Sequence, residues 1–460
     1  MPLILGANET KVTGYNVDNS CMFNDGDSAA MSRDQSANSA GTNTKGTLSV
    51  WLKMSAAGTE QVIYARETDA SNYFKVWFEN DRLLIQTVTS GSVTMKKETN
   101  RVFRDPGAWL NIVVILDSTD GTAEDRQQIW INGSRETSFA NSTNIGSSAN
   151  LQINTGTGTD YIGRRGSGNY YDGYMAELVW IDGTDYAATS FGEYDEDSPT
   201  IWKPIDVSGL TFGTNGFYLD FEASGNLGND VNGGTDFTES NLAATDQATD
   251  SCTNNFATIN PLDNYYANST FSEGNCTIVQ GSSTYAHNTS TIAVTAGKWY
   301  VEAKLTTDSE HALVGITDTP ALGTGTKILG SAAHDYSIKQ ANGDLFNNRG
   351  DDPANDATDY AAAYAQNDII GIALDCDNNK LYFSKGGAWS DGSGSWDSTT
   401  FNASVGAITI TAPASTDNGH YFFASGDYGS ASCTWEGNFG GNPPFSISSG
   451  NADGNGYGNF

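Results

Sequence analysis

The sequence predicts an all-β protein with two antiparallel β-sandwich domains joined by an extended linker. Almost no long window carries the apolar 3.6-residue period of an amphipathic helix; residues 356–368 are the one mild exception and fit a short helix or a loop. Short alternating apolar segments recur instead, separated by Gly, Asn, Asp and Ser. The chain also contains 51 Gly, 21 Tyr and 20 Phe, which is typical of turn-rich β structure.

Three segments of the first half predict strands of different kinds. Residues 48–54 place alternate apolar side chains on one face. Residues 110–117 are apolar on both faces, which predicts a central strand that is covered on both sides. Residues 127–137 predict a hairpin, because Asn132 and Gly133 tolerate the positive φ of a two-residue turn.

Strict alternation in two further segments predicts which side chains share a face. In residues 171–183, one face is expected to carry Met175, Val179 and Ile181, and the other Ala176, Leu178 and Trp180. In residues 298–307, one face is expected to carry Trp299, Val301, Ala303 and Leu305.

Residues 370–384 could form either a metal loop or a hairpin. Asp375, Asp377 and Asn379 are spaced two apart, as at the start of an EF-hand calcium loop. Such a loop also needs a glycine at its sixth position and a glutamate at its twelfth, where this chain has Lys380 and Gly386. The metal loop is therefore rejected.

A hairpin fits residues 370–384 better, with Asn378 and Asn379 as its two loop residues. This register pairs Asp377 with Lys380, Cys376 with Leu381, and Leu374 with Phe383. The apolar face is then made of Ile370, Ile372, Leu374, Cys376, Leu381 and Phe383.

Composition divides the chain into four parts. We expect a first sandwich over residues 1–222 and a second over residues 271–447. Residues 223–270 are small and polar with scattered apolar positions, which indicates an extended linker. Residues 448–460 form a glycine-rich tail.

The charge balance narrows the classes of partner. The 23 Lys and Arg face 55 Asp and Glu, so the formal net charge is −32. A surface of this sign repels nucleic acid and anionic membranes, so we expect no nucleic-acid partner. No segment has the apolar length of a membrane span, and the first residues lack the basic segment and cleavage site of a signal peptide.

The five cysteines are widely separated and odd in number. They are Cys21, Cys252, Cys276, Cys376 and Cys433. Neither a disulfide framework nor a cysteine-based zinc site has such spacing, and folding in a reducing cytoplasm fits.

Several stretches carry resemblances to known families. In order, GKWYVEAKL, VGIT, NDIIGIALDCDNNKLYFSKGGAW and NFGGNPPF resemble the signature of a SPRY domain, over about residues 271–447. The first half resembles a laminin G-like or concanavalin A-like jelly roll through MFNDGDSAAMSR, GTLSVWLKM, WINGSRETSF and YIGRRGSGNYYDGYMAELVWIDGT. The resemblance implies two sandwiches, of which the SPRY-like one binds partners through loops at one edge and is not an enzyme.

Nearly the whole chain is similar to lectin-like modules found with SPRY domains in virion proteins of tailed phages, especially marine ones. This similarity implies a structural protein of a tail fibre, a tail appendage or the capsid surface. It would bind a host-surface glycan or receptor in several copies, beside other virion proteins and further copies of itself. The expected location is the virion, assembled in the host cytoplasm and released on lysis.

Two other functions are weighed against adhesion. A purely architectural adaptor or decoration protein would bind only other virion subunits. A capsule-degrading glycoside hydrolase would need two acids that flank the glycosidic bond, spaced Glu-x-Asp-x-x-Glu on one strand. Asp220 and Glu222 come nearest, on a predicted strand, but no third acid follows at the required place, and residues 193–199 fit a surface turn. We therefore predict no catalytic residue.

Four aromatic residues in glycine-rich loops are the candidates for glycan or partner binding: Tyr170, Tyr171, Trp389 and Trp396. Sugar binding needs an aromatic face for the pyranose C–H groups and polar neighbours for the hydroxyls. Aromatic residues in these loops could equally cap the end of a sandwich or pack at a subunit interface.

No cofactor is expected, apart from a calcium ion that Asp25 and Asp27 could hold at a rim of the first domain. A plain Asp-Gly turn explains these two residues equally well. The four histidines are isolated from one another in the sequence, which favours structural roles: His287, His311, His334 and His420.

Overall fold

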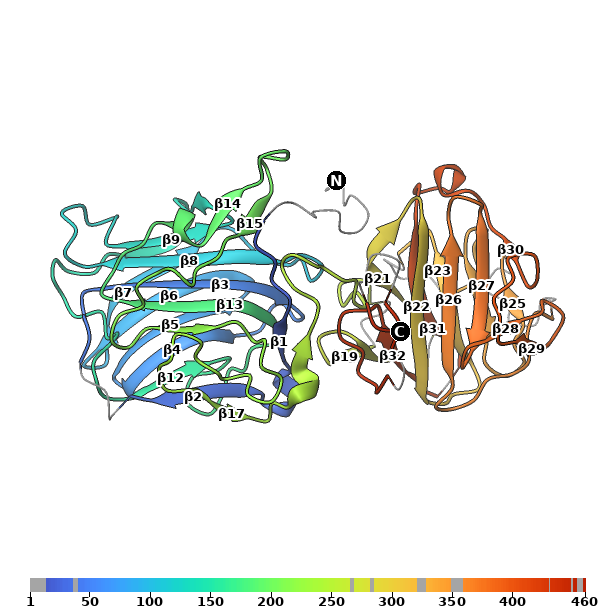
Figure 1. Cartoon of the computed structure of the whole chain (residues 1–460), viewed down its shortest axis with the longest axis horizontal. Coiled ribbons are helices and arrows are strands. Elements are labelled where there is room, and N and C mark those ends of the chain that lie inside the picture. The colour runs from blue at the N-terminus through green and yellow to red at the C-terminus, as the bar shows by residue number, and fades with distance from the viewer. Residues whose placement is uncertain are drawn as a thin grey trace. The chain divides into compact units, whose positions relative to one another are not determined.

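The structure is a computed structural model that describes residues 14–35, 40–264, 269–281, 285–320, 328–348, 359–429, 431–447, 450–452 and 458–460. The chain divides into two compact units between Asn255 and Phe256 (Figure 1). We call Asn8–Asn255 the first unit and Phe256–Phe460 the second unit. The described regular structure is β-strand apart from short 3-10 turns, which confirms the all-β prediction.

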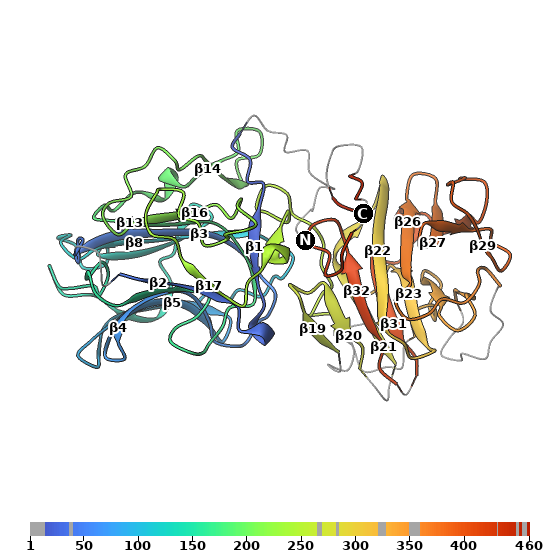
Figure 2. The same cartoon turned by 60° about the horizontal axis from the view of Figure 1, so that its bottom comes forward.

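The first unit is a sandwich of two antiparallel sheets, seen as two layers in Figure 2. One sheet has the order β10 (Ser134–Arg135), β9 (Gln127–Ile131), β8 (Leu110–Asp117), β3 (Lys45–Met54), β13 (Gly173–Asp182), β1 (Ser20–Phe23) and β18 (Gln247–Ala248), with β16 (Phe217–Leu219) also paired to β13. The other has the order β11 (Phe139–Thr143), β7 (Ser92–Thr99), β6 (Arg82–Thr89), β5 (Asn72–Glu79), β4 (Gln61–Asp69), β12 (Thr159–Ile162), β2 (Ala30–Asp34) and β17 (Thr238–Ser240). A separate two-stranded sheet joins β14 (Gly192–Tyr194) and β15 (Trp202–Pro204).

The central strands of the first unit follow their sequence pattern. Val50, Leu52 and Met54 of β3 all lie in the main core between the sheets. Strand β8 is covered on both faces, because Val114 belongs to the main core and Val113 to an outer apolar cluster. The turn at Asn132 and Gly133 joins β9 to β10 with positive φ at both residues, 47° and 72°. These three predictions are confirmed.

Strand β13 departs from strict alternation at a β-bulge. Its pairing with β3 shifts register between Ala176 and Val179, and Glu177 has a φ of 49°. The bulge places Met175, Leu178 and Trp180 in the main core. Ala176, Val179 and Ile181 lie in outer clusters. The predicted grouping of Met175 with Val179 and Ile181 is wrong, because the extra residue of a bulge reverses the alternation beyond it.

Several buried charges in the first unit are paired with each other. Arg33 lies 3.0 Å from Asp160 and 3.5 Å from Asp230, and all three side chains are almost fully buried. Lys53 lies 2.7 Å from Asp250, again with both side chains buried. Such pairs offset the cost of removing each charge from water.

Most of the segment expected to be a linker is part of the first sandwich. Strand β17 pairs with β2, and β18 pairs with β1, so residues 238–248 extend both sheets. Phe237 lies in the main core. Isolated apolar residues in a polar segment have no period, so their places in a distant core were not visible in the sequence.

The second unit is also a sandwich of two antiparallel sheets (Figure 2). One sheet has the order β19 (Thr270–Ser272), β20 (Thr277–Val279), β32 (Thr434–Asn438), β22 (Lys298–Thr307), β26 (Ile369–Asp375), β27 (Lys380–Lys385), β28 (Ala388–Ser390) and β29 (Trp396–Ser398), with β30 (Ile408–Thr409) also paired to β27. The other has the order β21 (Ala286–Val294), β31 (Tyr421–Asp427), β23 (Ala312–Thr317), β24 (Tyr336–Lys339) and β25 (Leu345–Phe346). Val301, Ala303 and Leu305 of β22 are in the core, and Trp299 packs against it, as predicted.

The hairpin of β26 and β27 exists, but its register differs from the prediction by two residues. Asp375 pairs with Lys380 and Leu374 with Leu381, so the loop has four residues rather than two. Asn378 donates from its backbone to Asp375 at 3.0 Å, and Asn379 alone of the two asparagines has a positive φ, 56°. A slip of two residues keeps every side chain on its face, so the predicted apolar face is still the buried one.

The described part of the tail returns to the second unit. The ring of Phe460 packs edge-on against Tyr300, with centroids 5.3 Å apart. Asn451 and Phe460 exchange two backbone hydrogen bonds. Residues 448–449 and 453–457 lie outside the described residues. Among the described residues, no helix has the length and apolar character to cross a membrane.

Candidate functional site

The structure separates the predicted pair Tyr170 and Tyr171. Tyr171 is fully buried in the main core of the first unit, and its hydroxyl donates to the carbonyl of Lys53 at 3.2 Å. Tyr171 belongs to a glycine-rich loop, which favoured an exposed position in the prediction. The loop leads into β13 at Gly173, and the side chain of Tyr171 already lies in the core. Tyr171 is therefore wrong as a binding residue, whereas the neighbouring Tyr170 is half-exposed.

The two predicted tryptophans lie on opposite sides of a hairpin in the second unit. Trp389 of β28 is paired with Ser398, and Trp396 of β29 is paired with Ser390. Trp396 packs against the core, and its indole nitrogen donates to the carbonyl of Ala362 at 2.8 Å. Trp389 instead lines a pocket at the surface. Of the two, only Trp389 is placed to contact a ligand there.

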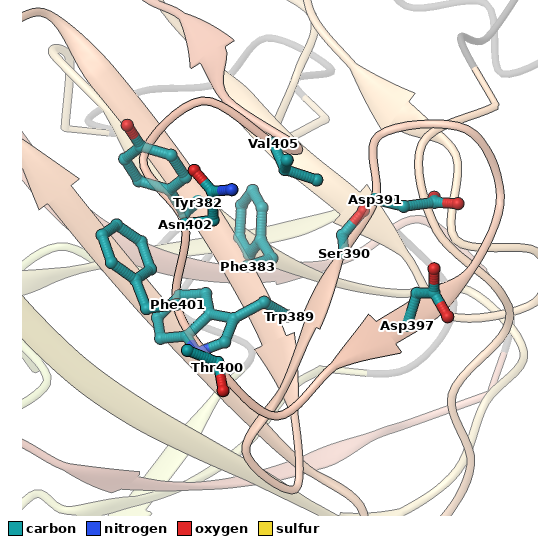
Figure 3. Close-up of a pocket in the computed structure, with 10 residues that line it drawn as sticks. All are labelled: Tyr382, Phe383, Trp389, Ser390, Asp391, Asp397, Thr400, Phe401, Asn402 and Val405. Atoms are coloured by element: carbon teal, nitrogen blue, oxygen red, sulfur yellow. The ribbon is translucent and has the colours of Figure 1, made fainter.

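The pocket beside Trp389 is formed by β27, β28 and the loop that precedes β30 (Figure 3). It has a volume of about 90 Å³. Its apolar lining is Tyr382, Phe383, Trp389, Phe401 and Val405, and its polar lining is Ser390, Asp391, Asp397, Thr400 and Asn402. Figure 3 shows the rings of Tyr382, Phe401 and Trp389 grouped at one end and the two aspartates at the other.

Three aromatic rings of the pocket pack edge to face. Phe401 lies 4.9 Å from Trp389 and 5.0 Å from Tyr382, measured between ring centroids. Tyr382 is buried, whereas Phe401 keeps 47% of its surface exposed. An exposed phenylalanine held between two other rings gives the pocket a rigid apolar wall that is open to solvent.

Hydrogen bonds to backbone carbonyls fix the loops of the pocket. The Tyr382 hydroxyl donates to the carbonyl of Ala403 at 3.0 Å. The hydroxyl of Tyr360 donates to the carbonyl of Gly406 at 2.7 Å, and Ser390 donates to the carbonyl of Tyr360 at 2.7 Å. The loop of Phe401 is therefore held to β27 through Tyr382, and to Tyr360 through Gly406.

The aspartates make the other end of the pocket negative. Asp391 accepts hydrogen bonds from the backbone of Ser393 at 2.8 Å and of Ser395 at 3.1 Å. The hydrogen bond from the Ser393 backbone is the main cause that holds the pKa of Asp391 below its usual range. Asp397 is exposed. Both carboxylates can accept hydrogen bonds from ligand hydroxyls.

The acids weighed for hydrolysis do not form a catalytic pair on a strand. Strand β16 ends at Leu219, and Asp220 accepts a hydrogen bond from the backbone of Glu222 at 3.0 Å in the following turn. Glu177 lies nearer the core, and burial raises its pKa to about 8. Its carboxylate accepts hydrogen bonds from Tyr218 at 2.8 Å and Tyr15 at 3.3 Å. The placement of Asp220 and Glu222 on a strand is therefore wrong.

The calcium candidates lie in a short 3-10 turn, Asp25–Asp27. Asp27 accepts a hydrogen bond from the side chain of Asn24 at 3.0 Å, and both aspartates are exposed. Within the described ranges, neither belongs to a group of three or more converging metal-ligand side chains. Calcium at Asp25 and Asp27 stays a prediction.

Two aromatic residues of the pocket and one histidine contact were not predicted from the sequence. Phe401 lies in a polar segment with no alternation, and Tyr382 alternates away from the core face, so neither had a periodic signal. His334, expected to be isolated, lies with its Nδ1 3.2 Å from Asp318. No local motif joins His334 to Asp318, because the two residues come from different loops.

Comparison with known families places two domains on the chain. Residues 24–184 match a laminin G-type model described as the concanavalin A-like lectin/glucanases superfamily. Residues 298–426 match the SPRY domain. The chain therefore contains a concanavalin A-like domain in the first unit and a SPRY domain in the second. No curated protein sequence matches the chain.

The solved structures that are similar to parts of the chain include a SPRY domain, a pentraxin and one domain of an arabinanase. The SPRY domain of human HERC1 is 14% identical, with a TM-score of 0.28, and the match covers 39% of this chain and 96% of that one. A heptameric SAP-like pentraxin from Limulus polyphemus is 14% identical, with a TM-score of 0.28, and the match covers 36% and 76%. Domain 4 of the arabinanase AbnA from Geobacillus stearothermophilus, solved with arabinotriose, is 16% identical, with a TM-score of 0.23, and the match covers 32% and 64%.

Proposed function

We propose that this protein is a non-catalytic binding protein whose second unit takes a sugar ring at the pocket of Trp389. The observation that carries this proposal is the wall of three aromatic rings, Tyr382, Trp389 and Phe401, that ends at two aspartates. Aromatic faces pack on the C–H groups of a pyranose, and carboxylates accept hydrogen bonds from its hydroxyls.

The size of the pocket sets the expected strength of binding. A volume of about 90 Å³ admits the edge of a sugar ring and leaves the rest of a glycan on the surface. Each site is then weak, and a useful affinity comes from several linked copies. We therefore include assembly of several copies of the chain in the proposal.

The proposed setting is the virion of a tailed phage, as part of a tail fibre, a tail appendage or the capsid surface. The support for this setting is the resemblance of nearly the whole chain to phage virion proteins that combine lectin-like and SPRY domains. In this setting the protein binds host-surface glycan or receptor after lysis, while other surfaces bind neighbouring virion proteins.

Glycan-array binding by the intact chain tests the proposed ligand. Substituting Trp389→Ala or Phe401→Ala is expected to weaken binding by at least about tenfold, because each removes a ring from the wall. Leu262→Ala is the matched control, since Leu262 is 51% exposed on the same unit and lies outside the pocket. Binding that survives both pocket substitutions would place the glycan elsewhere.

Labelling of intact particles tests the proposed setting independently. A tagged chain in a phage that encodes it should appear on the particle surface in electron micrographs, and adsorption to host cells should fall for Trp389→Ala. Binding to purified virion proteins without any glycan binding would favour the architectural function. Absence of the protein from purified particles would reject the virion setting. It would not bear on the proposal that the pocket of Trp389 binds a sugar.

A reducing-sugar assay tests the absence of catalysis. We expect no release from capsule polysaccharides by the intact chain. Release that disappears on Asp220→Asn or Glu222→Gln would overturn this part of the proposal and restore the hydrolase alternative.

A further inference from the structure

Three potential metal ligands converge in the second unit. Asp318 follows β23, His334 precedes β24, and Asp417 lies in the loop before β31. One ligand atom from each of the three side chains lies within 4.8 Å of the others. The three residues therefore bring three separate loops to one point.

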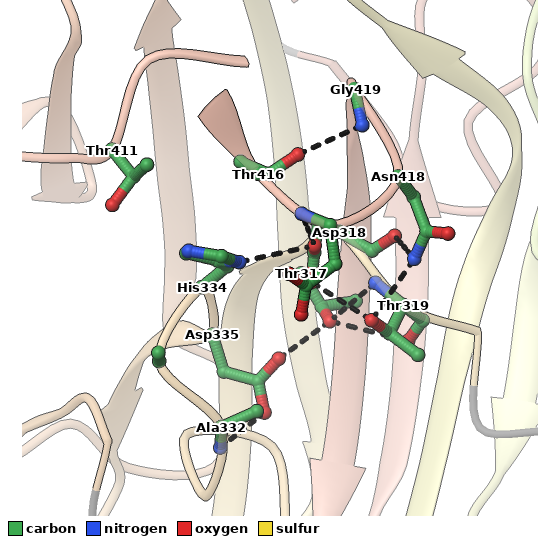
Figure 4. A network of polar contacts seen from close by, with 12 residues as sticks. Thr317, Asp318, Thr319, Ala332, His334, Asp335, Thr411, Thr416, Asn418 and Gly419 are labelled. Atoms are coloured by element: carbon green, nitrogen blue, oxygen red, sulfur yellow. Dashed lines mark hydrogen bonds and ion pairs between the residues drawn. The ribbon is translucent and has the colours of Figure 1, made fainter. Parts of the chain in front are cut away.

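The buried member, Asp318, is fixed in place by its neighbours. One of its carboxylate oxygens accepts hydrogen bonds from His334 Nδ1 at 3.2 Å and from the backbone of Asp417 at 3.0 Å. The other accepts from the hydroxyl of Thr319 at 2.9 Å. The side chain of Asn418 donates to the carbonyl of Asp318 at 3.0 Å. Figure 4 shows His334, Thr319 and Asn418 around Asp318.

Among the described residues, His334 is the basic side chain that contacts the carboxylates of the cluster. Asp318 is 1% exposed, and Asp417 adds a second carboxylate at the surface. Within the described part of the chain, no Lys or Arg forms an ion pair with Asp318 or Asp417. A buried carboxylate normally has a charged partner, because its desolvation is costly.

We propose that Asp318, His334 and Asp417 form a binding site for one divalent cation of the zinc class. An imidazole nitrogen and two carboxylate oxygens suit zinc and similar transition metals. The cation takes the place between His334 Nδ1 and Asp318, and the imidazole then carries its proton on Nε2. Three protein ligands leave a further coordination position for water or a ligand oxygen on the exposed side of Asp417.

The site gives the second unit a link between loops that the two sheets do not supply. A bound cation joins the ends of β23, β24 and the loop before β31 through direct bonds. Binding to the folded state alone stabilises that state in proportion to the logarithm of free metal concentration. This inference does not depend on the sugar-binding proposal, since Asp318, His334 and Asp417 do not line the pocket of Trp389.

Calorimetric titration of the chelator-treated full chain with zinc chloride tests the proposal. The unsubstituted protein should take up one zinc ion per chain and gain thermal stability. Asp417→Ala and His334→Ala should each weaken uptake by at least about tenfold, as loss of a direct ligand costs no less than loss of a supporting contact. Asp417→Ala is the main variant, because its exposed side chain can be removed without opening the core.

Two controls separate this site from other zinc ligands. His311→Ala removes a histidine, and Asp377→Ala an exposed aspartate, both of the second unit and outside the cluster. Both variants should bind zinc like the unsubstituted chain. All variants keep the five free cysteines, so any zinc uptake by cysteine is the same in each of them. The proposal is overturned if the unsubstituted chain shows no saturable uptake, or if Asp417→Ala and His334→Ala, folded in chelator, bind zinc equally well.

Discussion

The two units treat buried acids differently. In the first unit, Arg33 neutralises Asp160 and Asp230 inside the sandwich, and Lys53 neutralises Asp250. In the second unit, the lysines that form the described ion pairs all keep 25% or more of their side-chain surface exposed: Lys298, Lys304 and Lys385.

Buried acids of the second unit are held by hydroxyl and amide donors instead. Asp427 accepts from Ser309 at 2.5 Å and from the backbone of Gly429 at 2.6 Å, and burial raises its pKa. Asp318 accepts from Thr319 and from the backbone of Asp417. The first unit thus pairs Asp160, Asp230 and Asp250 with its own cations, whereas the acidic cluster that we propose as a metal site in the second unit has no Lys or Arg partner among the described residues.

Removal of Arg33 should have the largest effect. Arg33→Met leaves Asp230 without its cation and leaves Asp160 with Arg66 alone, at 3.7 Å, and we expect the free energy of unfolding to fall by about 4 kcal/mol. Denaturant unfolding of the full chain measures the change. Arg135→Met is the control, because its pair with Asp125 at 2.5 Å is at the surface and should cost less than about 1 kcal/mol. Equal losses of stability for Arg33→Met and Arg135→Met would show that the buried ion pairs of Arg33 contribute no more than a surface pair.

Glu177 of the first unit is a buried acid held by hydroxyl donors, like the buried acids of the second unit. We expect its ionisation to make the free energy of unfolding depend on pH. Burial raises its pKa from 4.5 to about 8. Between these values the folded state keeps the proton and the unfolded state releases it, so the stability contributed by Glu177 falls as pH rises. Relative to Glu177→Gln, the unsubstituted chain should lose on the order of a few kcal/mol from pH 4.5 to pH 8 and no more above it.

Unfolding titrations of both proteins across this range measure the difference. A constant difference would mean that Glu177 is ionised in the folded state. The hydroxyls of Tyr15 and Tyr218 would then stabilise a buried charge of the first unit without a cation from Arg or Lys.

Two glycines in turns differ in the space that an added Cβ would have, Gly133 in the first unit and Gly386 in the second. A Cβ on Gly133, which has a φ of 72°, would lie 2.4 Å from the ring of Trp202. A Cβ on Gly386, with a φ of 52°, would meet nothing within 4 Å. We expect Gly133→Ala to cost about 2 kcal/mol or more, and Gly386→Ala about 1 kcal/mol, in thermal unfolding. A reversed order would show that Trp202 does not pack on the turn.

The smallest effect should come from Asp417→Ala without metal. Its side chain is exposed, so the free energy of unfolding should change by less than about 0.5 kcal/mol in chelator. Added zinc should then stabilise the unsubstituted chain and leave the variant unchanged. A large loss in chelator would indicate that Asp417 has a structural role of its own.

Much of the sandwich architecture could be predicted from alternation. Strands β8 and β22 begin and end at the predicted residues, 110–117 and 298–307. The hairpin of β26 and β27 was predicted on the right face with the wrong register, because a two-residue slip leaves the pattern unchanged. The bulge at Glu177 has no such signal, because one extra residue is visible only in the pairing with β3.

The candidate site was predictable in one residue. Trp389 lies in β28 and lines a surface pocket, where its binding role stays a prediction, whereas Tyr171 is in the core. A tryptophan or tyrosine in a glycine-rich loop fits either position until the neighbouring strand is placed. The partners Phe401 and Tyr382 belong to the pocket because loops close over β27, which no local pattern indicates.

The sequence by itself determined that the chain is all-β and which side chains of its regular strands are buried. Both follow from the alternation of side chains along an extended backbone, which is a local property. The tertiary structure alone decided that His334 and Asp417, which lie 16 and 99 residues from Asp318, meet it at one point. Such convergence depends on how distant strands pair and where their loops end, and no spacing along the chain records it.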